Sequence, residues 1–329
     1  MAKKVKAAQA RYFYEMTISS SPHVHSPVTT QTIMRDVLIG LLPALIGSVY
    51  FFGFRALTVT AVSAAACVFF EWAWCKLMKV NCKVYDLSAV VTGVLLAFVC
   101  PVTVPLWCLI IGDFFAIIVV KQLFGGIGKN FMNPALAARA FMFSWPVIMS
   151  SGFQNAQWVD AVTEATPLAA MHQGQLPADS LLSMFVGNVG GCIGETSALL
   201  LLIGSAYLLI RKIISIRIPL AYLATVAIIA FVFPMGHDRL VWTGMQLCSG
   251  GLMLGALFMA TDYVTSPVTK WGQVLFGIGC GAITMVIRYF GGYNEGVSYA
   301  ILVMNTCVVL LDKVGRPRKY GTQKKEAKA

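Results

Sequence analysis

Ten apolar runs, separated by short polar or basic segments, dominate the pattern of hydrophobic and polar positions along the chain. An α-helix rises about 1.5 Å per residue, so about 20 apolar residues cross the hydrocarbon core of a bilayer. Most of the runs reach or nearly reach that length. They cover residues 37–54, 56–75, 87–105, 106–123, 131–149, 181–210, 218–235, 242–260, 273–290 and 297–311. The pattern predicts an all-α, polytopic membrane protein with about ten transmembrane helices.

The composition agrees with a protein that lies in a bilayer. Of the 329 residues, 58% are hydrophobic and only 12% are charged, whereas about a quarter of the residues of a soluble domain are charged. The net charge of +11 does not indicate nucleic-acid binding, because the basic residues lie in short clusters between apolar runs and not on one compact domain. We therefore expect membrane lipid, and no nucleic acid, as a partner.

Basic residues fall mainly on one side of the predicted membrane. When the N-terminus is placed in the cytoplasm, all but three of the 25 lysines and arginines lie in cytoplasmic segments, as the positive-inside rule requires. We expect a cytoplasmic N-terminal segment (1–36), a transmembrane domain (37–311) and a basic cytoplasmic tail (312–329). The long polar loop 150–180 then lies on the outer side. The three basic residues of the outer side are Arg55, Arg239 and Arg288.

The nine cysteines and four histidines give little sign of a metal centre. No two cysteines are spaced as C-x-x-C, and no two histidines share a predicted helix face. Ligands of zinc, haem and iron–sulfur clusters usually need such arrangements. We expect no metal site in this chain.

A weak internal similarity relates residues 87–105 to residues 247–267. These are the third and eighth predicted helices, so ten helices would divide into two halves of five. Because five is odd, the two halves would have opposite orientations in the membrane. Such inverted repeats occur in transporter-like folds, which place their sites on broken helices near the middle of the bilayer.

Two glycine-rich segments are predicted to break helices. Asn133-Pro134 in segment 125–141 favours a turn before a helix, and four glycines in segment 187–197 permit a break. Free N–H groups at a break can hold a polar or anionic group. An alternative is that the glycines only pack helices and the charges reach the interface. The candidate binding residues of the two segments are Lys129, Asn130, Asn133, Arg139, Glu195 and Thr196.

Two further acidic residues, Glu71 and Asp113, lie inside apolar runs. Charged groups are costly in hydrocarbon, so an acidic residue in a membrane helix is a candidate for an ion pathway. A second interpretation is that each carboxylate is only the partner of a cation, such as Lys121, Lys76 or a residue of another subunit.

The predicted outer loop contains the sequence DAVTEATP, which starts at Asp160. It resembles D-x-x-[S/T]-G-A-T, the motif on which a dedicated transferase installs FMN through a phosphoester to the last threonine. The matching residues are Asp160, Thr163, Ala165 and Thr166, and Glu164 stands where the motif has glycine. Pro167 favours an extended conformation at Thr166, which would present its hydroxyl to an enzyme.

Together with GKNFMNPALAARAF, GNVGGCIGETS, FMATDYVTSPVT and IRYFGGYNEGVSYAILVMNTCVVLLDK, this loop resembles one family over nearly the whole chain. The family comprises the D subunits of Rnf ion-translocating oxidoreductase complexes and the related B subunits of Na⁺-translocating NADH:quinone oxidoreductases. The short N-terminal segment favours the Rnf type. The resemblance implies a bacterial inner-membrane subunit that moves electrons between ferredoxin and NAD, coupled to Na⁺ or H⁺ transport.

The same resemblance implies cofactors and partners. We expect covalent FMN on Thr166 and, as in relatives, a non-covalent riboflavin nearer the cytoplasm, for which the residues of segment 125–141 are the best candidates. Expected partners are the A, B, C, E and G subunits of an Rnf complex, above all the FMN-bearing G subunit, and the flavin transferase. The B-type quinone reductase subunit, a non-redox solute transporter or channel, and a scaffold that only anchors its neighbours remain alternatives.

Overall fold

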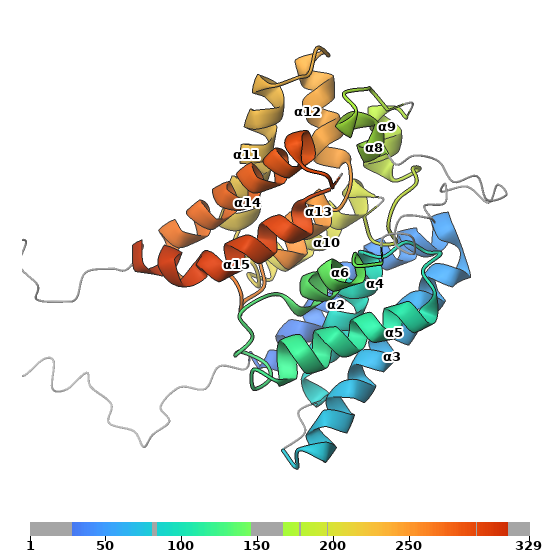
Figure 1. Cartoon of the computed structure of the whole chain (residues 1–329), viewed down its shortest axis with the longest axis vertical. Helices are drawn as coiled ribbons and strands as arrows, with labels where there is room; N and C mark the ends of the chain where they lie inside the picture. Colours follow the sequence, from blue (N-terminus) through green and yellow to red (C-terminus); the bar gives the residue numbers. More distant parts are fainter. Residues whose placement is uncertain are drawn as a thin grey trace, which may run out of the picture.

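The computed structural model describes residues 28–80, 84–145, 167–177, 179–195, 197–293 and 295–314, and this part of the chain is helical with no β-strand (Figure 1). η1 is a 3-10 helix, and η2 and η3 are π-helices. The elements are α2 (Thr30–Phe52), α3 (Phe54–Leu77), η1 (Val84–Asp86), α4 (Ser88–Phe98), α5 (Leu106–Phe114), η2 (Phe115–Gln122), α6 (Pro134–Met142), α8 (Pro167–His172), α9 (Leu181–Val186), α10 (Ala198–Ile210), α11 (Arg217–Val232), α12 (Arg239–Cys248), α13 (Leu252–Leu254), η3 (Gly255–Met259), α14 (Lys270–Phe290) and α15 (Val297–Val314).

Four of these helices, α2, α3, α14 and α15, are long and apolar enough to cross a membrane. The pair formed by α12 and α13–η3 makes a fifth span if it is counted as one, and it bends by 66° at its break. The shorter helices α4, α10 and α11 are also apolar. The predicted all-helical class is therefore confirmed for the described residues, with four or five candidate membrane spans. The number ten and the inverted halves stay predictions.

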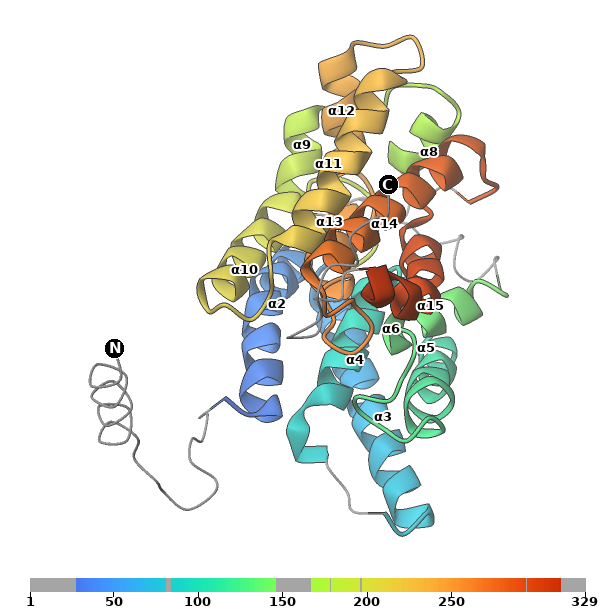
Figure 2. The same cartoon turned by 90° about the vertical axis from the view of Figure 1, so that its left-hand side faces the viewer.

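The helices form two groups that contact each other along the middle of the molecule. In Figure 1, α2 to α6 gather in the lower part and α11 to α15 in the upper part. Within the first group α3 packs on α4 and α5, and within the second α11 packs on α12 and α14. The groups meet where α6 lies against α15. Helix α10, which precedes the second group in the chain, lies against α2 of the first (Figure 2).

Caps and glycines determine where these helices begin and approach one another. Thr29 and Thr32 form a reciprocal cap at the start of α2, which satisfies backbone N–H groups that have no partner within the helix. Gly53, with φ of +74°, ends α2 and allows α3 to begin at the next residue. A Cβ atom on Gly204 would lie 1.9 Å from the carbonyl oxygen of Gly40, so the close contact of α2 and α10 requires glycine at position 204.

Candidate functional sites at the broken helices

The predicted break in segment 187–197 lies between α9 and α10, and it packs on the C-terminal end of α4. The amide of Gly194 donates to the Phe98 carbonyl oxygen at 2.9 Å, and the amide of Ile193 donates to that of Cys100 at 3.1 Å. A Cβ atom on Gly194 would lie 2.3 Å from the Phe98 ring. The break thus supplies donors to carbonyl groups that α4 leaves without helical partners, and glycine is required for the approach.

A buried ion cluster, formed by Arg139, Glu195, Glu295 and Arg288, lies beside this break. The Arg139 guanidinium on α6 donates from Nη1 to the Glu195 carboxylate at 3.1 Å, and it forms a short ion pair with Glu295. It also donates to Ser298 Oγ on α15 at 3.1 Å. Two arginines balance two glutamates, which reduces the large cost of holding charges away from water.

Arg288, on α14, connects the same cluster to the break between α12 and α13. Its guanidinium donates to the carbonyl oxygens of Gln246 at 2.7 Å and Ser249 at 3.0 Å. The Gly251 amide donates to Glu295 Oε1 at 3.0 Å. The end of α12 and the start of α13 are therefore held by opposite charges, an arginine at the free carbonyl groups and a carboxylate at the free amide.

Helix α8 contacts the ion cluster through a hydrogen bond between His172 and the backbone of Arg288. His172 Nδ1 lies 2.8 Å from the carbonyl oxygen of Arg288, and Pro167, Leu168 and Met171 are buried. Thr166 immediately precedes this helix in the sequence. The ion cluster therefore lies close to the end of the segment that carries the predicted flavin attachment motif.

Two buried polar atoms near the ion cluster have no hydrogen-bond partner among the described residues: Arg139 Nε and Ser249 Oγ. Most buried polar groups are satisfied, so an unsatisfied one needs a reason. Arg139 is not a residue that reaches out to the membrane interface, because only 3% of it is exposed.

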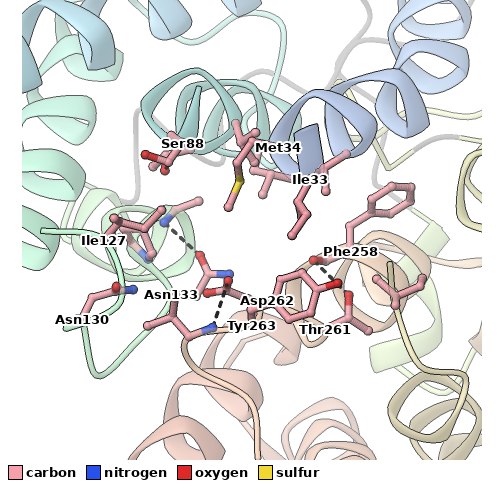
Figure 3. A pocket seen from close by; sticks show the side chains of 18 of the residues that line it. Ile33, Met34, Ser88, Ile127, Asn130, Asn133, Phe258, Thr261, Asp262 and Tyr263 are labelled. Carbon is pink, nitrogen blue, oxygen red and sulfur yellow. Dashed lines mark hydrogen bonds between the residues drawn. The ribbon is translucent and has the colours of Figure 1, made fainter. Parts of the chain in front are cut away.

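A cavity of about 100 Å³ lies at the other end of α6 (Figure 3). Its walls come from α2, α4, the segment before α6, and residues 258–264, and they are mainly apolar. The polar residues that line it are Ser88, Thr92, Lys121, Asn130, Asn133, Thr261, Asp262 and Tyr263.

Asn133 organises the wall of this cavity that comes from α6. Its side-chain oxygen accepts from the amides of Ala135 and Leu136, which makes it the N-cap of the helix, as Asn followed by Pro predicts. Its Nδ2 donates to the carbonyl oxygen of Met259, the last residue of η3, at 3.3 Å. A single side chain thus begins one helix and closes the end of another.

Asp262 and Tyr263 line the cavity beside Asn133, across from Ile33 and Met34 of α2 (Figure 3). Burial raises the pKa of the Asp262 carboxyl, while hydrogen bonds from Thr265 and from the amides of Val264 and Tyr263 oppose that shift. The Tyr263 hydroxyl donates to the carbonyl oxygen of Ile213, which ties residues 260–266 to the connection between α10 and α11.

The two acidic residues predicted to lie inside apolar runs have different surroundings. Glu71 pairs with Lys121 at 2.9 Å, and both side chains are buried. Asp113 accepts from Ser63 Oγ at 2.6 Å and lies 3.2 Å from Cys67 Sγ, but its Oδ2 has no partner among the described residues. The interpretation as a simple ion-pair partner therefore fits Glu71, whereas no basic side chain is paired with Asp113 in the described structure.

The sequence offered six candidate binding residues in the two broken segments, and the structure separates the five that it describes. Asn130 and Asn133 line the cavity, Lys129 is exposed and does not line it, and Arg139 and Glu195 belong to the ion cluster at the far end of α6. Thr196 and the flavin attachment motif, Asp160, Thr163, Ala165 and Thr166, lie outside the described residues.

Sequence reasoning did not single out Glu295 or Asp262, and it counted Arg288 only as an outer basic residue. Glu295 lies in a glycine-containing connection between two helices, where a carboxylate is ordinarily solvated. The sequence feature that could have pointed to Glu295 was the arginine in segment 125–141, because a buried arginine needs carboxylate partners.

Comparison with known proteins gives consistent matches along the whole chain. The model of the NQR2, RnfD, RnfE family matches residues 17–321. The chain is 51% identical to the D subunit of the Na⁺-translocating ferredoxin:NAD⁺ oxidoreductase complex of Acetobacterium woodii, over 95% of this chain and 98% of that protein. It is 41% identical to the D subunit of the proton-translocating ferredoxin:NAD⁺ oxidoreductase complex of Clostridium ljungdahlii, over 94% and 97%. It is 38% identical to the D subunit of the ion-translocating oxidoreductase complex of Stutzerimonas stutzeri, over 88% and 91%. The chain therefore belongs to the NQR2, RnfD, RnfE family.

Proposed function

We propose that the chain is the D-type subunit of an ion-translocating ferredoxin:NAD⁺ oxidoreductase complex and transfers electrons within it. The observation that carries this proposal is the 51% identity to such a subunit over nearly the full length of both chains. Two of the relatives are named for different ions, Na⁺ and the proton. Their similarity to this chain therefore supports ion translocation without selecting the ion.

We further propose that Thr166 carries FMN through a phosphoester bond, which makes a flavin the electron carrier of this subunit. The attachment motif supports this, and so does the anchoring of α8, which begins at the next residue and is held against Arg288. The residues present fit a flavin, because Arg139 offers a buried charge with an unpaired N–H group and aromatic side chains lie beside it. When bound, the flavin supplies one- and two-electron chemistry, and the protein orients and tunes it.

The ten-helix topology with two inverted halves is also a proposal. Two pairs of helix contacts support it, because the packing of α3 on α4 and α5 has a counterpart in the packing of α11 on α12 and α14. The ends of the broken helices match as well. The Gly194 amide binds the end of α4, and the Asn133 side chain binds the end of η3. In this topology both termini are cytoplasmic and the Thr166 loop is outside.

A second flavin, a non-covalent riboflavin, is proposed for the cavity at Asn133. The donor set suits a flavin, since asparagine amides and hydroxyls line an otherwise apolar space. The volume of the cavity does not suit a flavin, because it is about 100 Å³, whereas pockets for small-molecule ligands measure roughly 300–1,000 Å³. Riboflavin binding would therefore require the residues that line the cavity to move apart.

For ion movement we propose Asp113 and Glu71 as pathway residues. Asp113 is the stronger candidate, because its buried carboxylate has polar neighbours but no paired cation among the described residues. Moving one charge across the membrane involves roughly 2.3 kcal/mol per 100 mV. A buried carboxylate that binds and releases a cation is a suitable element for such a step.

The proposed partners follow from the same family membership. We expect the A, B, C, E and G subunits of an Rnf complex to contact this chain in the bacterial inner membrane, with the G subunit exchanging electrons with the outer flavin. We expect the flavin transferase to act on the Thr166 loop. The quinone-reductase B subunit is the alternative within the family.

Denaturing gel electrophoresis tests the flavin assignment. A phosphoester survives denaturant, so we expect an ultraviolet-excited flavin band from the purified chain and its complete loss in Thr166→Ala. Ser151→Ala is the matched control, because it removes a hydroxyl from the same loop outside the attachment motif and is expected to keep the band. A wild-type chain that lacks the band after coexpression with the transferase would favour the solute-transporter alternative.

A further inference from the structure

Three aromatic rings form a cluster beside the ion cluster, outside the sites described above. They belong to Phe143 at the end of α6, Tyr293 in the connection between α14 and α15, and Tyr299 in the first turn of α15. The ring centroids of Tyr293 and Tyr299 are 5.1 Å apart, and the Phe143 centroid is 6.1 Å and 6.3 Å from them. We call this the aromatic platform.

The aromatic platform opens to the surface. Tyr293 is 53% exposed, and Phe143 and Tyr299 are half-buried. Among the described residues, no atom lies within 4 Å of a Cβ atom built on the neighbouring Gly292. The exposed Tyr293 ring is therefore the part of the platform that a planar ligand reaches first.

Arg139 lies at the inner side of the aromatic platform. Its guanidinium carbon is 5.5 Å from the centroid of the Phe143 ring, a distance at which a cation interacts with an aromatic face. Its Nη atoms are engaged by Glu195, Glu295 and Ser298, but its buried Nε has no partner among the described residues. The platform thus combines aromatic rings with a guanidinium that is paired with two carboxylates and keeps one donor without a partner among the described residues.

One end of the chain segment that carries Thr166 lies beside the aromatic platform, and the other end lies near Glu295. The segment 146–166 starts three residues after Phe143. It ends directly before Pro167, the first residue of α8. The side chains of Leu168 on α8 and of Glu295 both lie within 3.5 Å of the position that a Cβ atom on Gly250 would take, so they are near each other. Glu295 follows Tyr293 by two residues. Since consecutive Cα atoms are about 3.8 Å apart, a group on Thr166 is tethered close to these rings.

We propose that Phe143, Tyr293 and Tyr299 hold the isoalloxazine ring of the FMN attached at Thr166, with Arg139 as the charge beneath it. This inference rests on the proposed function. Aromatic rings favour offset or edge contacts at centroid distances of about 4.5–7 Å, and the platform presents such contacts to a planar ring system. Exposed tyrosines are also common at membrane interfaces and at protein–protein contacts. The test must therefore distinguish flavin binding from these two alternatives.

Flavin fluorescence of the native, FMN-loaded complex provides the test. An excited flavin that touches a tyrosine ring loses its emission by electron transfer from the phenol. We expect the double substitution Tyr293→Leu and Tyr299→Leu to raise the native emission per covalent FMN several-fold and to increase quenching by iodide. The exposed single substitution Tyr293→Leu, which disturbs the fold least, is expected to change both quantities in the same direction. Phe290→Leu is the matched control, because Phe290 is 85% exposed on the adjacent end of α14 and is expected to leave both unchanged.

The outcomes are distinguishable. Unchanged emission from folded variants that carry a full complement of covalent FMN would show that the aromatic platform does not hold the flavin ring. That result would not affect the proposed covalent attachment. Unchanged emission with loss of a co-purifying subunit assigns the rings to a subunit interface, and it also overturns the inference. A wild-type chain without covalent flavin overturns the proposed attachment itself.

Discussion

Arg139→Leu is expected to be the most destabilising single substitution in the described part of the protein. It would leave the carboxylates of Glu195 and Glu295 in a buried site without their shared cation. Removing one partner of a buried ion pair costs about 3–5 kcal/mol, and here one arginine serves two carboxylates from two different connections. We expect loss of the monodisperse peak in size-exclusion chromatography and loss of the cooperative melting transition in detergent.

Two control variants show whether the position or the residue type causes the effect. Arg239→Leu also removes an arginine, but this side chain is exposed and its guanidinium lies over the Phe231 ring, so we expect near wild-type melting. Arg139→Lys keeps the charge without the planar fork that reaches both carboxylates, and we expect an intermediate loss. Wild-type stability of Arg139→Leu would mean that the ion cluster does not hold the two breaks together.

The second large effect is expected at the buried pair of Lys121 and Glu71. Lys121→Met would leave Glu71 with only the Gln122 amide as a partner among the described residues, at 2.8 Å, and should lower the free energy of unfolding by about 3–5 kcal/mol. The double variant Lys121→Met with Glu71→Gln removes both charges, so it should be clearly more stable than Lys121→Met alone. Thermal melting of the wild type, Lys121→Met, Glu71→Gln and the double variant in detergent measures this coupling.

The pair of Asp36 and Arg211 is the control for that cycle. Its atoms are 3.0 Å apart, but the Arg211 side chain is 53% exposed, so water competes for both charges and Arg211→Met should change melting little. If the double variant of Lys121 and Glu71 melts no higher than Lys121→Met, then the cost arises from lost packing of the lysine stem and not from the unpaired carboxylate.

The sequence predicted the helical class and the breaks well, because both depend on local patterns. Long apolar runs became α2, α3, α14 and α15. The glycines of segment 187–197 separated α9 from α10, and Asn133-Pro134 began α6. In each case nearby residues determine the backbone conformation, so no knowledge of distant contacts is needed.

The partners of buried charges could not be predicted, because they depend on contacts between distant segments. Arg139 meets Glu195 and Glu295, which are 56 and 156 residues away. Arg139 and Asn133 are nearly two turns apart on α6, so one helix serves two different sites. The two residues were grouped as one flavin site because they are close in sequence. The helix between them places their side chains at different ends of α6.

Helix lengths also differed from the apolar runs. The run 131–149 gave only α6 (Pro134–Met142) within its described part, and the run 242–260 gave the bent pair α12 and α13–η3. A hydropathy pattern cannot reveal such a bend, since the residues at 249–251 are small and the apolar character continues through them. Arg288 and Glu295, which are distant in the sequence, satisfy backbone groups that the bend frees.

The most direct test of the central claim is mass spectrometry of the peptide 158–173 from the chain purified in its complex. The claim predicts a mass increased by one FMN less one water, with fragment ions that place the addition on Thr166. Finding only the unmodified peptide, or an addition on Thr163, would contradict it.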